Sequence, residues 1–303
     1  MAKQKTIKNQ KKIWAIGGGK GGIGKTLFTA NLGVGLAGMG KKVIVVDSDL
    51  GGANLHTLLG EKFVKYNLND YINNTCSLED AVLPTSIENL KLVSGANGIL
   101  GSANPRYFQK MKTIRCFNKL EADYILVDLG AGSSFNVLDF LNSADEKIVI
   151  FSPEPTSIQN AYGFLKSALY RKLIRTFKDN KPVQETITKG IDPKNEKKVS
   201  TLDELSKRIC KVDKKGHVVF KETVYNYRPN TIVNMLKKKG EQNTALGLSL
   251  TAKKFLNLDM NYLGFVESDD IVSESVKAMT PFMKMSPDAK ICNSINKILH
   301  QLV

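Results

Sequence analysis

What this 303-residue sequence lacks excludes several classes of protein. Residues 1–12 are polar and basic without an apolar core, so the sequence predicts no secretory signal. No apolar run approaches the roughly 20 residues of a membrane-spanning helix. The four cysteines and three histidines are scattered, and the cysteines form no Cys-x-x-Cys pair. This pattern contains no zinc or iron–sulfur motif and predicts free thiols in a reducing cytoplasm.

The net charge of +15 is unevenly distributed along the chain. Residues 166–254 carry 22 Lys and Arg against 9 Asp and Glu, whereas residues 255–303 carry 4 against 6. A basic block of this kind favours an anionic partner, either nucleic acid or an anionic membrane surface. Solvated helix faces are the alternative explanation.

The most informative stretch is a glycine-rich turn near the N-terminus. The apolar residues Ile13–Ile16 predict a strand, and the periodic segment Leu27–Met39 predicts a helix. Between them, Gly19–Thr26 matches the spacing G-x-x-x-x-G-K-[ST] of a phosphate-binding loop. A flexible glycine turn is the alternative. The residues predicted to hold a nucleotide here are Gly19, Gly21, Gly22, Ile23, Gly24, Lys25, Thr26 and Leu27.

The chemistry of a polyphosphate explains these residue types. Glycines let successive backbone N–H groups turn inward, where a Cβ would obstruct the turn or the ligand. Lys25 supplies a positive charge to the outer phosphates, and the Thr26 hydroxyl is a ligand for Mg²⁺. The helix that opens there directs its positive dipole end at the anion.

Two further apolar runs end in aspartate. Lys42–Asp47 is followed by Asp49, and Tyr124–Asp128 is followed by glycines. Ligands gather at the carboxyl ends of parallel strands, so these carboxylates belong beside the phosphate loop. The second run is typical of a Walker B strand, whose carboxylate, Asp128, contributes to the Mg²⁺ environment.

Strand and helix patterns alternate through the first 175 residues, which predicts an α/β fold: one doubly wound, mostly parallel sheet with helices on both faces. Lys147–Phe151 continues the alternation, and prolines stop it before a helix over Ser157–Ile174. We expect a basic tail over 1–12 and a single P-loop domain over 13–303, which the family resemblance described below identifies as an ATPase domain. Its basic elaboration covers about 178–215, since the sheet needs strands on both sides of that region.

The C-terminal part continues the fold less clearly. Within the elaboration, Thr201–Ile209 is a good helix with Thr201 as N-cap and Glu204 at the capping-box position. Strand composition returns at His217–Asn226 and again at Asn261–Val266. Helices are predicted over Thr231–Lys239, over Thr244–Leu256 and at the C-terminus.

A second lysine in the loop indicates which group of P-loop proteins the chain resembles. Lys20 gives the loop the sequence Lys-Gly-Gly-Ile-Gly-Lys-Thr, with two lysines where an ordinary phosphate loop has one. This resembles the deviant Walker A motif of the MinD/ParA group of P-loop ATPases, in which the extra lysine reaches the nucleotide of a facing subunit. The resemblance implies ATP and Mg²⁺ as cofactors, a homodimer formed around ATP, and Lys20 and Lys25 as catalytic residues. A solvated loop lysine is the alternative for Lys20.

The segment from Asp47 to Asn54 resembles the D-x-D switch of the same group. In that group the first Asp helps to hold the Mg²⁺ shell, the second orients the attacking water, and the Asn lies in the switch facing the second subunit. The resemblance assigns these roles to Asp47, Asp49 and Asn54. The implied metal site is thus Thr26, Asp47 and Asp128.

The family also implies where the base binds. An Asn at the end of a late strand recognises adenine in the group, and a segment after another strand closes over the base. These positions fall on Asn226, with Arg228 beside it, and on Pro153 and Glu154.

Within the group, the run Pro153–Tyr162 looks most like the FlhG/FleN (YlxH) branch, which regulates flagellar number and placement. That branch implies a slow ATPase switch and an unidentified protein partner that stimulates hydrolysis. Residues 1–12 lack the branch's activation segment. A ParA-like chromosome or plasmid partition ATPase that binds DNA non-specifically is the alternative function. An iron–sulfur carrier is disfavoured because it would need paired cysteines, which are absent here. A non-enzymatic binding module is disfavoured because the residues expected for hydrolysis, Lys25, Thr26, Asp47, Asp49 and Asp128, are all present.

The terminal segment Asp288–Val303 bears on whether the protein binds the membrane. MinD itself ends in an amphipathic membrane-targeting helix, so the alternatives are a cytoplasmic protein and one that is peripheral at the inner face of the membrane. This segment has few flanking lysines and no aromatic residue, which predicts a helix packed on the sheet. Its apolar stripe comprises Ile291, Ile295, Ile298, Leu299 and Leu302.

Overall fold

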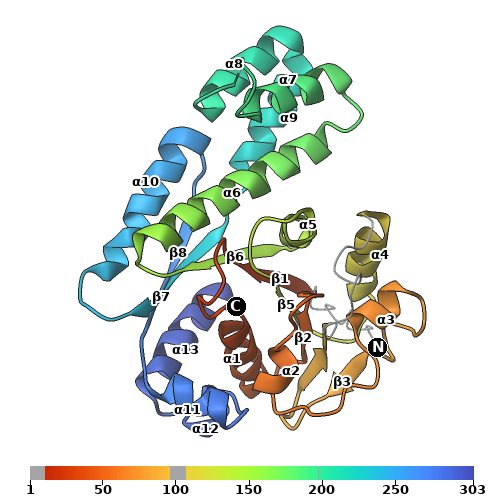
Figure 1. The fold of residues 1–303 in the computed structure, drawn as a ribbon, viewed down its shortest axis with the longest axis vertical. Coiled ribbons are helices and arrows are strands. Elements are labelled where there is room, and N and C mark those ends of the chain that lie inside the picture. Colours follow the sequence, from red (N-terminus) through yellow and green to blue (C-terminus); the bar gives the residue numbers. More distant parts are fainter. Residues whose placement is uncertain (1–10, 96–106, 197) are drawn as a thin grey trace, which may run out of the picture.

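The computed structural model describes residues 11–95, 107–196 and 198–303, and most of the predicted basic tail lies outside these residues (Figure 1). Within this part of the chain, eight strands form one sheet in the order β3-β4-β2-β5-β1-β6-β7-β8. Every neighbouring pair is parallel except β3 and β4. The strands are β1 (Lys12–Gly17), β2 (Val43–Asp47), β3 (Val82–Pro84), β4 (Leu90–Val93), β5 (Tyr124–Asp128), β6 (Glu146–Phe151), β7 (Asn230–Leu236) and β8 (Asn261–Glu267).

Both faces of the sheet are buried, which explains why the central strands are continuously apolar. In β1, Ile13 and Ala15 pack into the core on one face, and Trp14 and Ile16 pack into the core on the other. One face is covered by α3 (Leu68–Ile72), α4 (Tyr107–Phe117), α5 (Phe135–Ser143), α6 (Pro155–Thr176) and α10 (Thr244–Leu256). The other is covered by α1 (Lys25–Gly38), α2 (Leu55–Leu58), α11 (Ile271–Lys277), α12 (Phe282–Met285) and α13 (Lys290–Leu302). The predicted doubly wound α/β fold is therefore confirmed.

Three helices form a separate layer beyond α6, at the top of Figure 1. They are α7 (Lys181–Ile191), α8 (Leu202–Val212) and α9 (Lys214–Tyr225), and they pack on α6 and α10. The side chains of Ile187, Leu205 and Phe220 are buried there and join the core of the same sheet face. The basic elaboration is thus more regular than its composition predicted.

The α8 N-terminus has the predicted cap with one difference. The Thr201 hydroxyl accepts the Glu204 N–H at 3.3 Å. The Glu204 carboxylate accepts the N–H of Ser200 at 3.0 Å, one residue before the position that a capping box requires.

Two adjacent predictions were wrong. The predicted strand His217–Asn226 is the helix α9, whose N-cap Asp213 accepts the Lys215 N–H at 2.9 Å. Phe220 and Val224, four residues apart, form its buried face. The predicted helix Thr231–Lys239 is instead the strand β7, which is buried between β6 and β8. Short apolar runs fit either structure, and here the neighbouring strands decide the outcome.

The terminal helix packs as predicted. Ile291, Ile295, Ile298, Leu299 and Leu302 of α13 are all buried against α1 and β8. Gly35 lets α1 and α13 approach closely, since a Cβ there would lie 2.4 Å from Leu299 Cδ1. No helix in the described part of the chain is long and apolar enough to cross a membrane.

Candidate functional site

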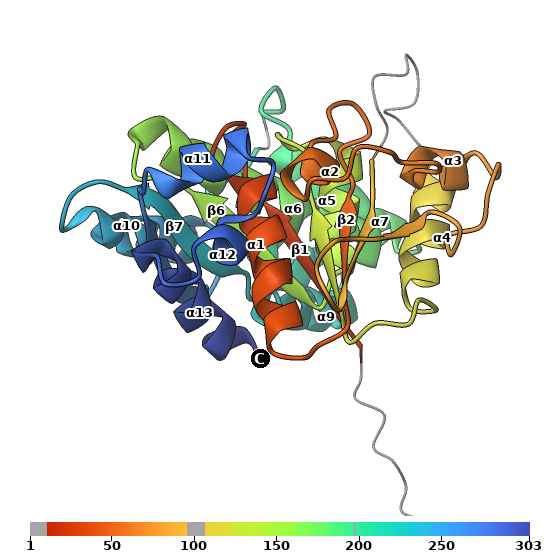
Figure 2. The same cartoon turned by 90° about the horizontal axis from the view of Figure 1, so that it is seen from below.

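The glycine-rich loop joins β1 to α1 at the carboxyl end of the sheet, the same end at which α2 and α11 lie (Figure 2). Gly22 and Gly24 have φ angles of 75° and 83°, in the left-handed region that favours glycine. Gly19 lies against α6, because a Cβ there would be 2.1 Å from the backbone oxygen of Asn160. The loop therefore needs glycine for its turn and for its contact with the neighbouring helix.

Lys25 lies at the start of α1 and is only 7% exposed. Its Nζ donates a hydrogen bond to the backbone oxygen of Lys20 at 3.3 Å, so it folds back into the loop. Burial lowers the pKa of Lys25, and the negative charges of Asp128 and Asp49 oppose this shift. An ammonium in this position can meet the outer phosphates of a nucleotide cradled by the loop.

Asp47 and Asp128 are direct neighbours at the ends of β2 and β5, and both are buried. The Asp47 carboxylate accepts three backbone N–H groups, from Asp49 at 3.0 Å, Asn54 at 3.0 Å and Leu55 at 3.1 Å. Burial nevertheless raises the pKa of Asp47 to about 6. The loop after β2 is thus organised around this carboxylate.

The pKa of Asp128 is raised further than that of Asp47. Burial, and then the charge of Asp47, raise its pKa to about 8, although hydrogen bonds from Thr26 and Thr29 and the charge of Lys25 lower it. The Thr29 hydroxyl lies 3.3 Å from Asp128 Oδ1. Two adjacent buried carboxylates repel each other, and a bound cation relieves that repulsion.

The donor set fits Mg²⁺. The hydroxyl of Thr26 and the carboxylates of Asp47 and Asp128 are hard oxygen ligands, and Thr26 is close enough to Asp128 to lower the pKa of that carboxyl. Among the described residues, no group of three or more His, Cys, Asp or Glu side chains could hold a metal by itself. Mg²⁺ at nucleotide sites takes its remaining ligands from phosphates and water.

Asp49 lies beside the loop that follows β5. Its Oδ1 accepts the N–H groups of Gly51 and Gly52, each at 3.1 Å. A Cβ on Gly130 would lie 3.2 Å from Asp49 Oδ2, so the two loops nearly touch. Asn54 is exposed, and its side-chain amide donates to the Gly52 carbonyl at 2.8 Å. The structure brings Asp47, Asp49 and Asp128 to one edge, as predicted from the sequence.

Lys20 is exposed at the rim of the loop. Its Nζ lies 3.3 Å from the hydroxyl of Thr156, in the first turn of α6. The neighbouring Glu154 accepts a hydrogen bond from Ser152, which lowers its pKa together with the charges of Lys20 and Lys237. Lys20 thus lies between the phosphate loop and the start of α6.

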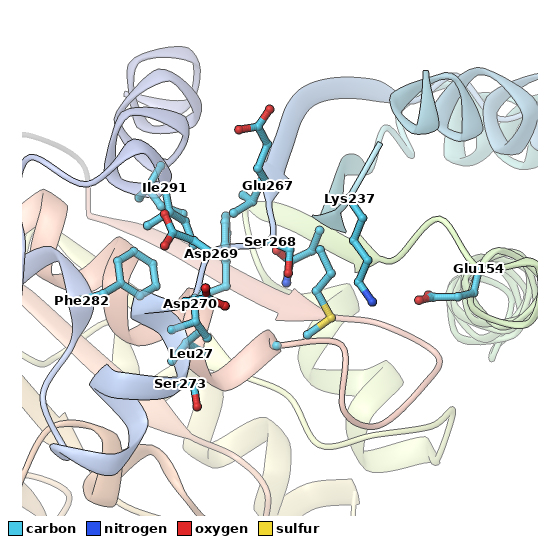
Figure 3. A pocket seen from close by; sticks show the side chains of 17 residues that line it. Leu27, Glu154, Lys237, Glu267, Ser268, Asp269, Asp270, Ser273, Phe282 and Ile291 are labelled. Atoms are coloured by element: carbon cyan, nitrogen blue, oxygen red, sulfur yellow. The ribbon is translucent and has the colours of Figure 1, made fainter. Parts of the chain in front are cut away.

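A cavity of about 370 Å³ opens beside the loop, between the start of α1 and the ends of β7 and β8 (Figure 3). Glu154 and Lys237 point toward each other across it. Its wall includes Asn234, whose Nδ2 donates to the Ile23 carbonyl at 2.8 Å. The next residue, Met235, has a φ of 62°, in the left-handed region that is unfavourable for a non-glycine residue.

The structure does not bring Asn226 and Arg228 to this site. Asn226 follows α9 and precedes β7, so it lies at the end of the sheet opposite the phosphate loop. The Arg228 Nε donates to the backbone oxygen of Tyr225 at 3.3 Å. Their assignment depended on the incorrect strand, and Asn234, near the end of β7, occupies the position at the cavity. The β-branched run Thr231–Val233 before it is the sequence signal that could have identified this strand.

Comparison with known protein sequences finds relatives among the ParA and MinD P-loop proteins. The family model described as "ParA: NUBPL iron-transfer P-loop NTPase" matches residues 9–167. The antiactivator FleN of Pseudomonas aeruginosa is 35% identical over 156 residues, covering 51% of this chain and 55% of FleN. The septum site-determining protein MinD of Helicobacter pylori is 35% identical over 153 residues, covering 49% and 56%. The chain thus spans about half the length of the curated relatives it matches.

The same fold occurs in solved structures. MinD of Pyrococcus horikoshii, complexed with Mg-ADP, has a TM-score of 0.65 at 24% identity, covering 96% of both chains. A ParA-family ATPase from Chlorobium tepidum has a TM-score of 0.65 at 19% identity, covering 97% of this chain and 100% of that one. These identities establish the fold alone, whereas the family model matches more than half of the sequence. The chain therefore belongs to the ParA family of P-loop NTPases.

Proposed function

We propose that the chain, as a single domain over 13–303, is an ATP-dependent molecular switch that hydrolyses ATP slowly with Mg²⁺. The observation that carries the proposal is the pair of buried neighbours Asp47 and Asp128 beside Lys25 and the glycine-rich loop. Loop N–H groups would cradle the phosphates, and Lys25 would meet the outer ones. Mg²⁺, held by Thr26, Asp47 and Asp128, would neutralise the phosphate charge that develops during hydrolysis.

Two residues would make the site responsive to a second copy of the chain. Asp49, close to the backbone of Gly130, would orient the attacking water. Lys20, exposed at the rim, would reach the nucleotide of the facing subunit in a homodimer formed around ATP. Hydrolysis would be slow in one chain because the site is complete only across the dimer interface.

The base would occupy the cavity beside Asn234. The Nδ2 of this residue is already bound to Ile23, so its side-chain oxygen is the atom suited to accept a hydrogen bond from the adenine amino group. Glu154, which lines the cavity, and Pro153 just before it would close the mouth of the cavity from the side of α6.

The cellular role most consistent with the relatives is the placement or number of a cellular structure, most directly of flagella. FleN is named an antiactivator and MinD is named septum site-determining, and both match this chain at similar identity. A protein partner would stimulate hydrolysis. The basic block favours a second candidate, a partition ATPase that binds DNA non-specifically, or else an anionic membrane as the partner surface. The four cysteines are free and lie far apart in the sequence, which does not favour an iron–sulfur carrier.

Sedimentation velocity tests the switch. The wild-type protein at micromolar concentration should be a monomer with Mg-ADP and a dimer with a non-hydrolysable ATP analogue and Mg²⁺. Lys20→Ala is the matched variant, because it should bind the analogue and remain a monomer. A wild-type monomer with the bound analogue would contradict the dimeric switch, and a dimer of Lys20→Ala would remove the role of Lys20.

A further inference from the structure

A cavity lies at the end of the sheet opposite the phosphate loop, and nucleotide binding does not explain it. It opens between the start of β6 and the later parts of α6 and α9, and its volume is about 340 Å³. Its lining contains two lysines, one from β6 and one from α6. The lining residues are Lys147, Lys172, Val219, Glu222, Thr223, Asn226 and Tyr227.

The amine of Lys147 is held in one place at the cavity wall. Lys147 is half-buried, and its Nζ donates a hydrogen bond to the Ala144 carbonyl at 2.9 Å. The same Nζ lies 5.8 Å from the ring centre of the buried Tyr227. The Tyr227 hydroxyl donates to Asn142 Oδ1 at 2.9 Å, and the Asn142 amide donates to the Ala168 carbonyl at 2.9 Å. Contacts that join α5, α6 and the turn before β7 therefore position this amine.

The charge of Lys147 has no ion pair. Among the described residues, no carboxylate lies within ion-pair distance of its Nζ. The two acidic residues before it in the sequence have other hydrogen-bond partners. Asp145 Oδ2 accepts the Ile13 N–H at 2.8 Å, and Glu146 Oε2 accepts from the side-chain amide of Asn230 at 2.7 Å. The ammonium form of Lys147 is therefore partly desolvated without a compensating negative charge.

Lys172 brings a second positive charge to the cavity. It is half-buried on α6, and within the described ranges no carboxylate lies at ion-pair distance from it. Glu222 is the single carboxylate in the lining, and it is exposed. Burial lowers the pKa of Lys147 and the charge of Lys172 lowers it further, although the charges of Glu146 and Asp145 oppose this shift. Lys147 therefore contains more of the neutral amine than an exposed lysine does at the same pH.

A neutral amine beside an ammonium group suits a reaction with an anionic electrophile. The neutral nitrogen of Lys147 has a lone pair for attack and can still donate its hydrogen bond to Ala144. Burial or a neighbouring cation is what makes a lysine nucleophilic in proteins, and Lys147 has both. The ammonium of Lys172 is a point charge that can bind the anionic part of the electrophile. Ligand pockets range from about 300 to 1,000 Å³, so this cavity suits a small molecule.

We propose that the cavity between β6, α6 and α9 is an acylation site, in which Lys147 attacks small acyl phosphates that Lys172 binds. The Lys147 nitrogen would form a bond to the acyl carbon as the bond from that carbon to the phosphate oxygen breaks. Phosphate would leave with the electron pair of that bond and take up the proton of the amine. The products would be an amide on Lys147 and inorganic phosphate. The amide is uncharged, so the repulsion between the two lysines would be lost.

The alternative is a purely structural lysine. Ala144 is the C-cap residue of α5, and a positive charge at the C-terminus of a helix is stabilising. An ammonium with that role would be charged and shielded by the protein, so it should react with acyl donors more slowly than an exposed lysine. The two explanations thus predict opposite orders of reactivity.

The test is a competition among the lysines of the full-length protein, incubated with acetyl phosphate and without nucleotide. Mass spectrometry of peptides from the quenched reaction measures the initial rate of acetylation at each lysine. Lys147 should react at least about fivefold faster than the mean of four exposed reference lysines, because a desolvated amine beside a cation is the better nucleophile. The reference lysines are Lys62, Lys181, Lys194 and Lys277. The experiment needs no ATP hydrolysis, so its failure is distinguishable from failure of the proposed function.

Substitutions at the second lysine test the binding of the anion. Lys172→Gln should lower the rate at Lys147 to that of the reference lysines, whereas Lys172→Arg keeps the charge and should keep most of the rate. Lys166→Gln is the matched control, because Lys166 is exposed on the same helix and outside the lining. It should leave the rate at Lys147 unchanged, and all three variants should melt at the wild-type temperature.

A neutral donor separates binding of the anion from the reactivity of the amine. The N-hydroxysuccinimide ester of acetic acid has no charge for Lys172 to bind, so it should favour Lys147 over the reference lysines less than acetyl phosphate does.

Three results would overturn the inference. The first is a rate at Lys147 no higher than that of the reference lysines in the wild-type protein, which would make Lys147 a structural lysine. The second is an equal rate at Lys147 in the wild type and in Lys172→Gln, or an equal loss in Lys166→Gln. The third is the same preference for Lys147 with both donors, which would show that the cavity does not hold the anion.

Discussion

Replacing Gly19 by alanine should destabilise the protein even when no nucleotide is present. The added Cβ would lie 2.1 Å from the backbone oxygen of Asn160 and 2.6 Å from its carbonyl carbon. These are backbone atoms of α6, so no side-chain rotation can remove the clash, and the loop or the helix must move. Overpacking of this kind costs about 1–3 kcal/mol. The lower entropy of the unfolded chain with alanine offsets about 0.4–1 kcal/mol.

The net loss of about 1–2 kcal/mol corresponds to a melting temperature lowered by about 1.5–3 °C, because the entropy of unfolding of a 303-residue chain is about 0.6 kcal/mol/K. Gly21→Ala is the matched control in the same loop, since the nearest atom to its Cβ would be Ala131 Cβ at 3.8 Å, an ordinary contact. Thermal unfolding of the nucleotide-free proteins, followed by circular dichroism, measures both. If Gly19→Ala has the melting temperature of wild type, or if Gly21→Ala is lowered as much as Gly19→Ala, then the packing of the loop on α6 does not explain the need for glycine at position 19.

Three further substitutions test a buried ion pair, the packing of α13 and the role proposed for Asp49. Burial opposes ionisation of Asp139, but hydrogen bonds from Arg171 and Lys110 hold its pKa below the ordinary 3.8. The ionised Asp139 should therefore make its full contribution to the free energy of unfolding above about pH 4. That contribution should be lost as the pH falls through the lower pKa that Asp139 has in the folded state. Asp139→Asn should cost about 3–5 kcal/mol at neutral pH and flatten the acid limb of a stability profile; an unchanged limb would contradict this. Ile295→Ala in α13 should cost about 2–5 kcal/mol in urea unfolding, whereas Val303→Ala, at an exposed position, should stay within about 0.5 kcal/mol. Asp49→Ala should retain ATP binding and hydrolyse more slowly, and equal loss of both would show that its role is misassigned.

The phosphate end of the site could be predicted from the sequence because its information is local. Each of β1, β2 and β5 is a short apolar run that ends directly in a functional residue or loop. Burial on both sheet faces makes such runs easy to find, and parallel pairing then brings their ends together. The adjacency of Asp47 and Asp128 follows from this pairing.

The base end of the site could not be predicted in the same way. α9 and β7 are both short segments rich in valine and other apolar residues, and periodicity alone does not separate them. The difference is tertiary, because β7 is enclosed by β6 and β8 while α9 buries only one face. The error placed the predicted adenine contact on Asn226, whereas the cavity proposed for the base lies beside Asn234. The contact between Gly19 and α6 is also tertiary, and no local pattern encodes it.

The most direct test of the central claim is phosphate release from ATP by wild-type protein and by Lys25→Ala, each with Mg²⁺ and with excess chelator. We expect slow, Mg²⁺-dependent release by wild type and none above background by Lys25→Ala, with both proteins folded by circular dichroism. Equal release by the two proteins, or release by wild type that the chelator does not reduce, would contradict the claim that this loop and its carboxylates form an ATPase site.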